Sequence, residues 1–190
     1  TGLENYGTAT VIATNFVGFG ISVLNDQGAL TMEGCVTEAP YFASLVNSSG
    51  QTNSEIRGGT ANLTDCKLAA GVSERPSAGF DAIYNGGDYY GAGITLNELG
   101  GKMTLTDCEV AGINSESREG WNDKYTSPEN VTLTIKGGTY TRNIYSSGQL
   151  TIQDAVVNGT IRISALRDYT GSKNYDEDNF KLVMDNVTVN

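Results

Sequence analysis

A short pattern of apolar residues recurs along this chain and constrains its fold more than any other feature. Its clearest copy runs from Met103 to Val110, where the apolar residues form two alternating pairs separated by the polar step Thr106-Asp107. Alternation with a period of two residues indicates a β-strand, and the two-residue step indicates a bend after which the same side again faces inward. We call this pattern the repeat frame.

Seven stretches fit the repeat frame. The clear copies are Leu30, Met32, Cys35 and Thr37; Ala61, Leu63, Cys66 and Leu68; Met103, Leu105, Cys108 and Val110; Leu150, Ile152, Ala155 and Val157; and Leu182, Met184, Val187 and Val189. Weaker copies are Leu133, Ile135, Gly138 and Tyr140, and Val11, Ala13, Phe16 and Gly18. One copy cannot bury its apolar row alone, whereas stacked copies form a continuous core, so the pattern predicts a solenoid.

The spacing of the frames is irregular. Successive frames begin between 17 residues apart (Leu133 to Leu150) and 42 residues apart (Ala61 to Met103). A solenoid tolerates this variation because insertions leave at the corners of a coil without disturbing the stack. The longest interval is expected to hold either one coil with a long loop or a second, degraded coil.

A second element precedes several frames, a short strand that ends in Asn and is followed by Gly. It occurs at Gly20–Asn25 before Gly28, at Ala43–Asn47 before Gly50 and at Gly93–Asn97 before Gly100, with a shorter relative at Asn143–Gly148. Glycine suits a tight corner because it adopts positive φ without a steric penalty. If the coils are in register, Asn25, Asn47 and Asn97 are expected to form a side-chain ladder at one corner.

The stretch from Ile144 to Gly159 resembles the coil repeat of right-handed parallel β-helices in the pectate-lyase-like superfamily. It is most similar to the coils of secreted bacterial surface proteins, including adhesins and autotransporter passengers. The resemblance implies an all-β fold, a right-handed parallel β-helix of about seven to eight coils with loop insertions, forming a single domain over residues 1–190. It also implies a secreted or cell-surface location. It transfers no catalytic residue, because this fold serves lyases, hydrolases and adhesins alike.

Composition restricts the partners of the chain. The formal net charge is −10 and the isoelectric point is about 4.3, which argues against nucleic acid and against an anionic membrane surface as partners. The sequence contains no apolar run long enough to insert into a membrane. The chain starts at Thr1, and its last frame ends at Val189 with one residue after it. We therefore expect a segment of a longer protein, or a chain whose ends associate end to end with another copy.

The three cysteines occupy the same position of the repeat frame, which predicts one interior column. Cys35, Cys66 and Cys108 lie where other frames carry Ala, Gly or Val. A metal site needs ligands that converge from several directions, and the chain contains no His. We expect the thiols to serve as small apolar side chains and expect no cofactor, with a disulfide between stacked neighbours as the alternative.

Irregular stretches rich in aromatic and acidic residues follow two of the cysteine-bearing frames. Residues Gly71–Tyr90 follow the Cys66 frame and Asn114–Glu129 follow the Cys108 frame, so both are expected to leave the same side of the solenoid. The ligand-binding residues predicted there are Tyr84, Tyr89, Tyr90, Trp121, Tyr125, Asp81, Asp88 and Asp123. Aromatic faces beside carboxylates suit a glycan or another host or cell-surface ligand. The alternative is that the rings only cover the apolar flank of the solenoid.

A third irregular stretch, near the C-terminus, contains the acidic run Asp176, Glu177 and Asp178. Several carboxylate oxygens can hold a Ca²⁺ ion. The run lacks the spaced pattern of a dedicated calcium loop, however, and a solvated acidic loop is the expected alternative. The sequence therefore predicts no metal site elsewhere and only this candidate here.

Catalysis is an alternative to binding. The absence of His excludes mechanisms that depend on His for proton transfer. A polysaccharide lyase or glycoside hydrolase of this fold would have to use other groups, and the candidates are Arg142, Asp154, Arg162 and Asp168. A third alternative is a structural stalk that spaces another domain from the cell surface. Of the three, the sequence favours an adhesin-like, carbohydrate-binding role.

Trp121 is the aromatic residue that no frame position explains, and it provides the first test. We expect Trp121→Ala to weaken glycan binding by about 1–3 kcal/mol while the melting temperature changes little, because a ligand-stacking ring contributes to binding and not to the core. A glycan array and thermal unfolding of both proteins measure the two effects. Equal array signals for the two proteins would remove Trp121 from the site.

Overall fold

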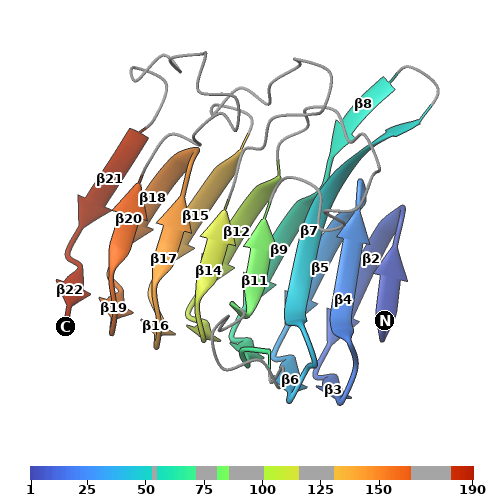
Figure 1. Cartoon of the computed structure of the whole chain (residues 1–190), viewed down its shortest axis with the longest axis horizontal. Helices are drawn as coiled ribbons and strands as arrows, with labels where there is room; N and C mark the ends of the chain where they lie inside the picture. The colour runs from blue at the N-terminus through green and yellow to red at the C-terminus, as the bar shows by residue number, and fades with distance from the viewer. Residues whose placement is uncertain (53–54, 72–80, 86–100, 116–130, 164–180) are drawn as a thin grey trace, which may run out of the picture.

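The computed structural model describes residues 1–52, 55–71, 81–85, 101–115, 131–163 and 181–190. Every regular element in these ranges is a β-strand, and the strands form three parallel sheets, which we name A, B and C. The chain visits the sheets in the order A, B, C seven times, so the molecule is a parallel β-helix of seven coils (Figure 1).

Each coil contributes one strand to each sheet. Sheet A contains β1 (Leu3–Asn5), β4 (Ile21–Asp26), β7 (Ala43–Thr52), β11 (Ile83–Asn85), β14 (Ile113–Ser115), β17 (Ile144–Ser146) and β20 (Ile161–Ile163). Sheet B contains β2 (Thr8–Ile12), β5 (Ala29–Glu33), β9 (Thr60–Thr64), β12 (Lys102–Thr106), β15 (Thr132–Lys136), β18 (Gln149–Gln153) and β21 (Lys181–Asp185). Sheet C contains β3 (Asn15–Val17), β6 (Val36–Glu38), β10 (Lys67–Leu68), β13 (Glu109–Val110), β16 (Thr139–Tyr140), β19 (Val156–Val157) and β22 (Thr188–Val189). One further strand, β8 (Glu55–Gly58), pairs antiparallel with the end of β7 and forms a hairpin off the solenoid (Figure 1).

The inward columns predicted from the repeat frame are confirmed. Leu63, Leu105, Ile135 and Ile152 are successive partners in sheet B, and each is at most 1% exposed. Leu45, Ile83, Ile113 and Ile144 form the equivalent buried column of sheet A. Because strands in a sheet lie about 4.8 Å apart, each buried side chain packs directly on its counterpart in the next coil.

Six of the seven frames are confirmed, and the first was predicted two residues too late. Ala9 pairs with Leu30, Val11 with Met32 and Phe16 with Thr37. The first frame therefore starts at Ala9, and Ala13 is not an inward residue but the corner, with φ of 46°. The start of the first frame was misplaced because Ala9 is only weakly apolar.

The polar step of the frame is a bend in the left-handed region of backbone conformation. The second residue of the step has positive φ in every coil, namely Ala13, Gly34, Asp65, Asp107, Gly137, Asp154 and Asn186. Gly, Asn and Asp adopt this conformation at the lowest cost, which explains their dominance at the position. The bend turns each chain from sheet B into sheet C while keeping the same side inward.

A buried amide ladder closes the corner between sheets A and B. Asn25 Nδ2 donates to Asn47 Oδ1 over 2.7 Å, as predicted, and Asn47 Nδ2 donates to Asn85 Oδ1 over 2.8 Å. The ladder begins one coil earlier, where Asn5 Nδ2 donates to Asn25 Oδ1 over 2.7 Å, and it ends at Ser115, whose Oγ accepts from Asn85 over 3.1 Å. The predicted third rung, Asn97, lies outside the described residues.

The predicted irregular stretch Gly71–Tyr90 is interrupted by a strand. Residues Ile83–Asn85 form β11, so the 42-residue interval holds one coil with one strand in each sheet. Gly71–Tyr90 and Asn114–Glu129 were predicted to leave the solenoid on the same side. This prediction is wrong for the part of Gly71–Tyr90 that precedes β11, because the chain between β10 and β11 connects sheet C to sheet A. The segments after β11 and after β14 both connect sheet A to sheet B.

The ladder is expected to contribute strongly to stability. Replacing Asn47 by Leu removes the acceptor of the Asn25 amide and both donors of Asn47, and a buried polar group left without a partner costs about 1–3 kcal/mol. We expect a loss of that size or more in the free energy of unfolding, measured by urea titration. The control is Asn62→Ala on the exposed face of sheet B, where a change within about 0.5 kcal/mol is expected. Equal effects of the two variants would contradict the role of the ladder.

Candidate functional site

The outer faces of sheets A and B differ in chemistry. The central outward column of sheet B consists mainly of threonines, namely Thr10, Thr31, Thr104, Thr134 and Thr151, with Asn62 between Thr31 and Thr104. The outward positions of its described strands contain no aromatic residue. Threonine suits a pleated surface because its branched side chain is stiff there. The central column of sheet B therefore offers hydroxyl groups but no rings for stacking.

Sheet A has aromatic, amide and guanidinium groups on its outer face. Tyr84, Asn114, Tyr145 and Arg162 are successive partners on β11, β14, β17 and β20, and we call these four residues the sheet A column. The first three are partly buried and Arg162 is exposed. The Arg162 guanidinium carbon lies 5.9 Å from the centre of the Tyr145 ring, which is within the range of a cation–π interaction.

Strand alternation places these side chains outward. Tyr84 lies between the buried residues Ile83 and Asn85, and Tyr145 lies between the buried residues Ile144 and Ser146. Because successive residues of a strand face opposite sides, burial of the neighbours forces each tyrosine to the outside. The two tyrosines are thus positioned by the buried residues on either side of them.

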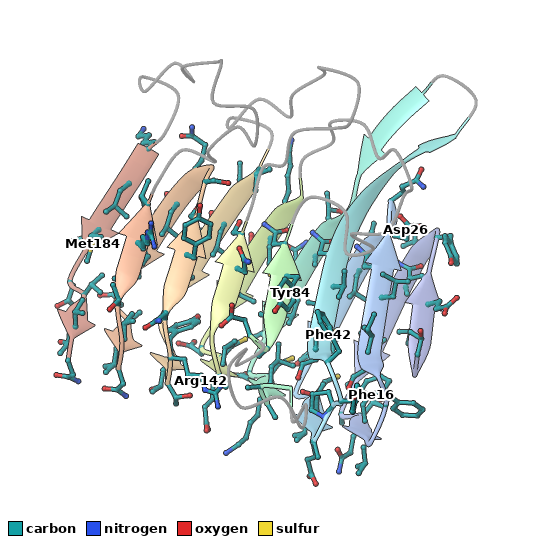
Figure 2. All side chains as sticks on the ribbon, viewed as in Figure 1. Phe16, Asp26, Phe42, Tyr84, Arg142 and Met184 are labelled. Atoms are coloured by element: carbon teal, nitrogen blue, oxygen red, sulfur yellow. The ribbon has the colours of Figure 1, made fainter. Side chains whose placement is uncertain are left out.

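An apolar cluster supports one end of the sheet A column. Leu24 and Val46 precede Tyr84 in the same outward column and are buried, and Phe42 packs against the same cluster. The Phe42 and Tyr84 rings are stacked with centres 5.2 Å apart and an interplanar angle of 28°, and Figure 2 shows both on one side of the molecule. The Tyr84 hydroxyl also accepts a hydrogen bond from the Asp81 amide over 3.4 Å. Tyr84 is therefore held in a defined orientation.

Two of the eight predicted ligand-binding residues lie in the described part of the chain. Tyr84 belongs to β11, and Asp81 lies two residues before the start of that strand. The other six lie outside the described residues: Asp88, Tyr89, Tyr90, Trp121, Asp123 and Tyr125. Asn114 and Tyr145 were not among the predicted residues. The signal for Tyr145 is its place in the short strand at Asn143–Gly148, where it alternates with Ile144 and Ser146.

The alternative catalytic set is not brought together. Asp154 lies at the corner between sheets B and C, where its Oδ1 accepts a hydrogen bond from Asn186 over 2.7 Å. Arg142 lies between β16 and β17, at the corner between sheets C and A (Figure 2), and Arg162 lies on the outer face of sheet A. Asp168 is outside the described residues. The three described members therefore occupy three different sides of the coil.

The three cysteines are buried and free, in agreement with the predicted interior column. The thiols of Cys66 and Cys108 donate to the carbonyl oxygens of Thr64 and Thr106, each over 3.3 Å. Burial raises the pKa of Cys35, and a hydrogen bond with Cys108 together with burial raises the pKa of Cys66. Within the described ranges no three His, Cys, Asp or Glu side chains are placed to hold a metal ion. The calcium candidate Asp176, Glu177 and Asp178 lies outside them.

Comparisons of this chain with protein-family models, with curated proteins and with solved structures give no match. The part of the chain that the structure describes contains no helix long and apolar enough to cross a membrane.

Burial should make the thiols of Cys35 and Cys66 unreactive in the folded protein. At pH 8 the raised pKa values keep Cys35 and Cys66 as neutral thiols, and the thiolate is the reactive species. We expect a thiol-specific chromogenic reagent to label these two cysteines only slowly in the folded protein, and all three rapidly in denaturant. Mass spectrometry of the labelled peptides identifies the sites. Rapid labelling of Cys35 or Cys66 before unfolding would contradict the buried column.

Proposed function

We propose that this chain is an adhesin-like, carbohydrate-binding module of a secreted bacterial surface protein, and that the sheet A column contacts the glycan. The observation that carries the proposal is the placement of two tyrosines, an amide and a guanidinium in one outward column of a rigid sheet. Aromatic faces bind the C–H groups of sugars, while amide and guanidinium groups form hydrogen bonds with hydroxyl groups.

The spacing of the column suits an extended oligosaccharide that runs along the solenoid axis. Tyr84 and Tyr145 are two strands apart, which corresponds to about 9.6 Å at about 4.8 Å per strand. This separation is close to the length of a disaccharide unit. Alternate sugar rings can therefore stack on the two tyrosines while the intervening sugar hydrogen-bonds with Asn114.

The packing of the two tyrosines against neighbouring side chains also favours binding. Side chains that are already ordered lose little conformational entropy when a ligand binds, so more of the contact energy appears as affinity. Tyr84 is packed against Phe42, and Tyr145 lies beneath the Arg162 guanidinium. The column is thus preorganised at both of its aromatic positions.

The charge of the chain narrows the glycan class. With a net charge of −10, the protein repels polyanionic polysaccharides at a distance, and Arg162 is the only cationic residue of the column. We therefore propose neutral or amino-sugar glycans as ligands. No observation in the described part of the chain favours the lyase or hydrolase alternative, because Arg142, Asp154 and Arg162 lie on different sides of the coil.

The test compares sheet A with sheet B. We expect Tyr145→Ala to weaken binding of the best glycan by about 1–2 kcal/mol, which is roughly five- to thirtyfold in Kd. Arg162→Ala is expected to have a smaller effect in the same direction. The matched control is Thr151→Ala, an outward residue of β18 in the same coil as Tyr145.

A glycan array selects the ligand, and isothermal titration calorimetry measures Kd for the four proteins. Equal losses for Tyr145→Ala and Thr151→Ala would place the ligand elsewhere. Absence of binding to any neutral or amino-sugar glycan would overturn the proposal.

A further inference from the structure

The chain contains two Asn-Gly pairs, Asn85-Gly86 and Asn158-Gly159, and the fold places the two asparagines in opposite environments. Asn85 is 1% exposed and belongs to the buried amide ladder. Asn158 is exposed and follows β19 at the corner between sheets C and A, where Figure 2 labels Arg142. An Asn followed by Gly is prone to lose ammonia spontaneously, because a residue without a side chain lets its amide nitrogen approach the Asn side chain.

Three features of the Asn158-Gly159 pair favour this reaction. The Gly159 amide nitrogen, which is the nucleophile, donates to no hydrogen bond among the described residues, so it is available for the attack. Asn190 Nδ2 donates to Asn158 Oδ1 over 2.7 Å, and this oxygen is the atom on which negative charge develops during the attack. A donor in this position stabilises the transition state as the donors of an oxyanion hole do. The leaving nitrogen, Asn158 Nδ2, belongs to an exposed side chain and has no hydrogen-bond partner in the described ranges.

The leaving nitrogen of Asn85 is held by three hydrogen bonds instead. Its Nδ2 donates to the carbonyl oxygens of Gly101 and Thr132, each over 3.2 Å, and to Ser115 Oγ over 3.1 Å. Loss of ammonia would leave these acceptors without their donor, and a buried polar group without a partner is costly. Water, which is needed to open the cyclic intermediate, does not reach this buried side chain. The fold therefore protects Asn85 and leaves Asn158 reactive.

We propose that Asn158 is a site of spontaneous deamidation in the folded protein. The Gly159 nitrogen loses its proton to water and forms a bond with the side-chain carbonyl carbon of Asn158. The bond between that carbon and Nδ2 then breaks, and the leaving nitrogen takes up a proton from water and departs as ammonia. Water adds to either carbonyl carbon of the resulting succinimide and opens the ring, so the product at position 158 is an aspartate or an isoaspartate. No atom is oxidised or reduced.

The modification changes the corner that leads into β20. Either product adds one negative charge, and an isoaspartate also lengthens the main chain between β19 and β20 by one methylene group. The Thr160 amide, which donates to Asn143 Oδ1 over 2.9 Å, lies directly after this point. Because β20 carries Arg162, the isoaspartate is expected to displace Arg162 from the Tyr145 ring. The reaction itself does not depend on the proposed glycan site.

Mass spectrometry of peptides measures the reaction at both Asn-Gly pairs. In the folded chain kept at pH 8, the peptide with Asn158 should gain the mass difference between an amide and an acid, while the peptide with Asn85 should not. In denaturant both pairs should react at similar rates, because the protection of Asn85 comes from the fold. Asn158→Gln should abolish the reaction, because the longer side chain cannot form the succinimide.

The hydrogen bond from Asn190 is tested by Asn190→Ala, which should slow deamidation of Asn158 about fivefold, equivalent to about 1 kcal/mol. The matched control is Asn186→Gly, which removes the similar hydrogen bond to Asp154 in the same two coils and should leave the rate unchanged. Glycine is used there because Asn186 has φ of 50°. Circular dichroism with thermal unfolding verifies that each variant is folded. Three results would overturn the proposal: an unmodified Asn158 in the folded chain, equal modification of Asn85 and Asn158, or a rate that Asn190→Ala does not change.

Discussion

In-register stacking of like residues is the constraint on which the rest of this structure depends. Each coil must return every inward residue to a point directly above its counterpart, about 4.8 Å away. The bend with positive φ meets this requirement, because it turns the chain from sheet B to sheet C without reversing which side faces inward. Asp107 and the equivalent residues of the other coils repeat this bend at every level. The buried columns of Leu, Ile, Met and Cys follow from that repetition.

The amide ladder stabilises the corner between sheets A and B. A buried amide must be hydrogen-bonded, and each ladder Asn donates to its neighbour and to the backbone. Asn25 binds the carbonyl oxygen of Gly28, Asn47 that of Gly59 and Asn85 that of Gly101. The segment between each Asn and its Gly differs greatly in length, yet the hydrogen bond is the same. The corner is therefore closed by the side chain, and the length of the connecting segment does not alter the stack.

The outward residues are not under this constraint, so they can differ from one sheet to the next. Sheet B carries threonines and sheet A carries the column of Tyr84, Asn114, Tyr145 and Arg162 on the same kind of backbone. The proposed glycan contact depends on the fixed spacing of the coils along the solenoid axis. The proposal thus places function on side chains whose positions are fixed by the core.

The sequence by itself determined the solenoid, because a period-two pattern with a constant polar step can be buried only by stacking copies of itself. It also determined the cysteine column, since the three cysteines share one frame position, and the Asn25–Asn47 contact, since each of these Asn residues ends a short strand that precedes a frame. It misplaced the first frame, because Ala9 is too small to stand out, and it missed β11, because Ile83–Asn85 lies isolated in an irregular stretch. Successive members of the sheet A column are 17 to 31 positions apart in the sequence. Only the tertiary register brings those residues together, since proximity between coils depends on pairing and not on distance along the chain.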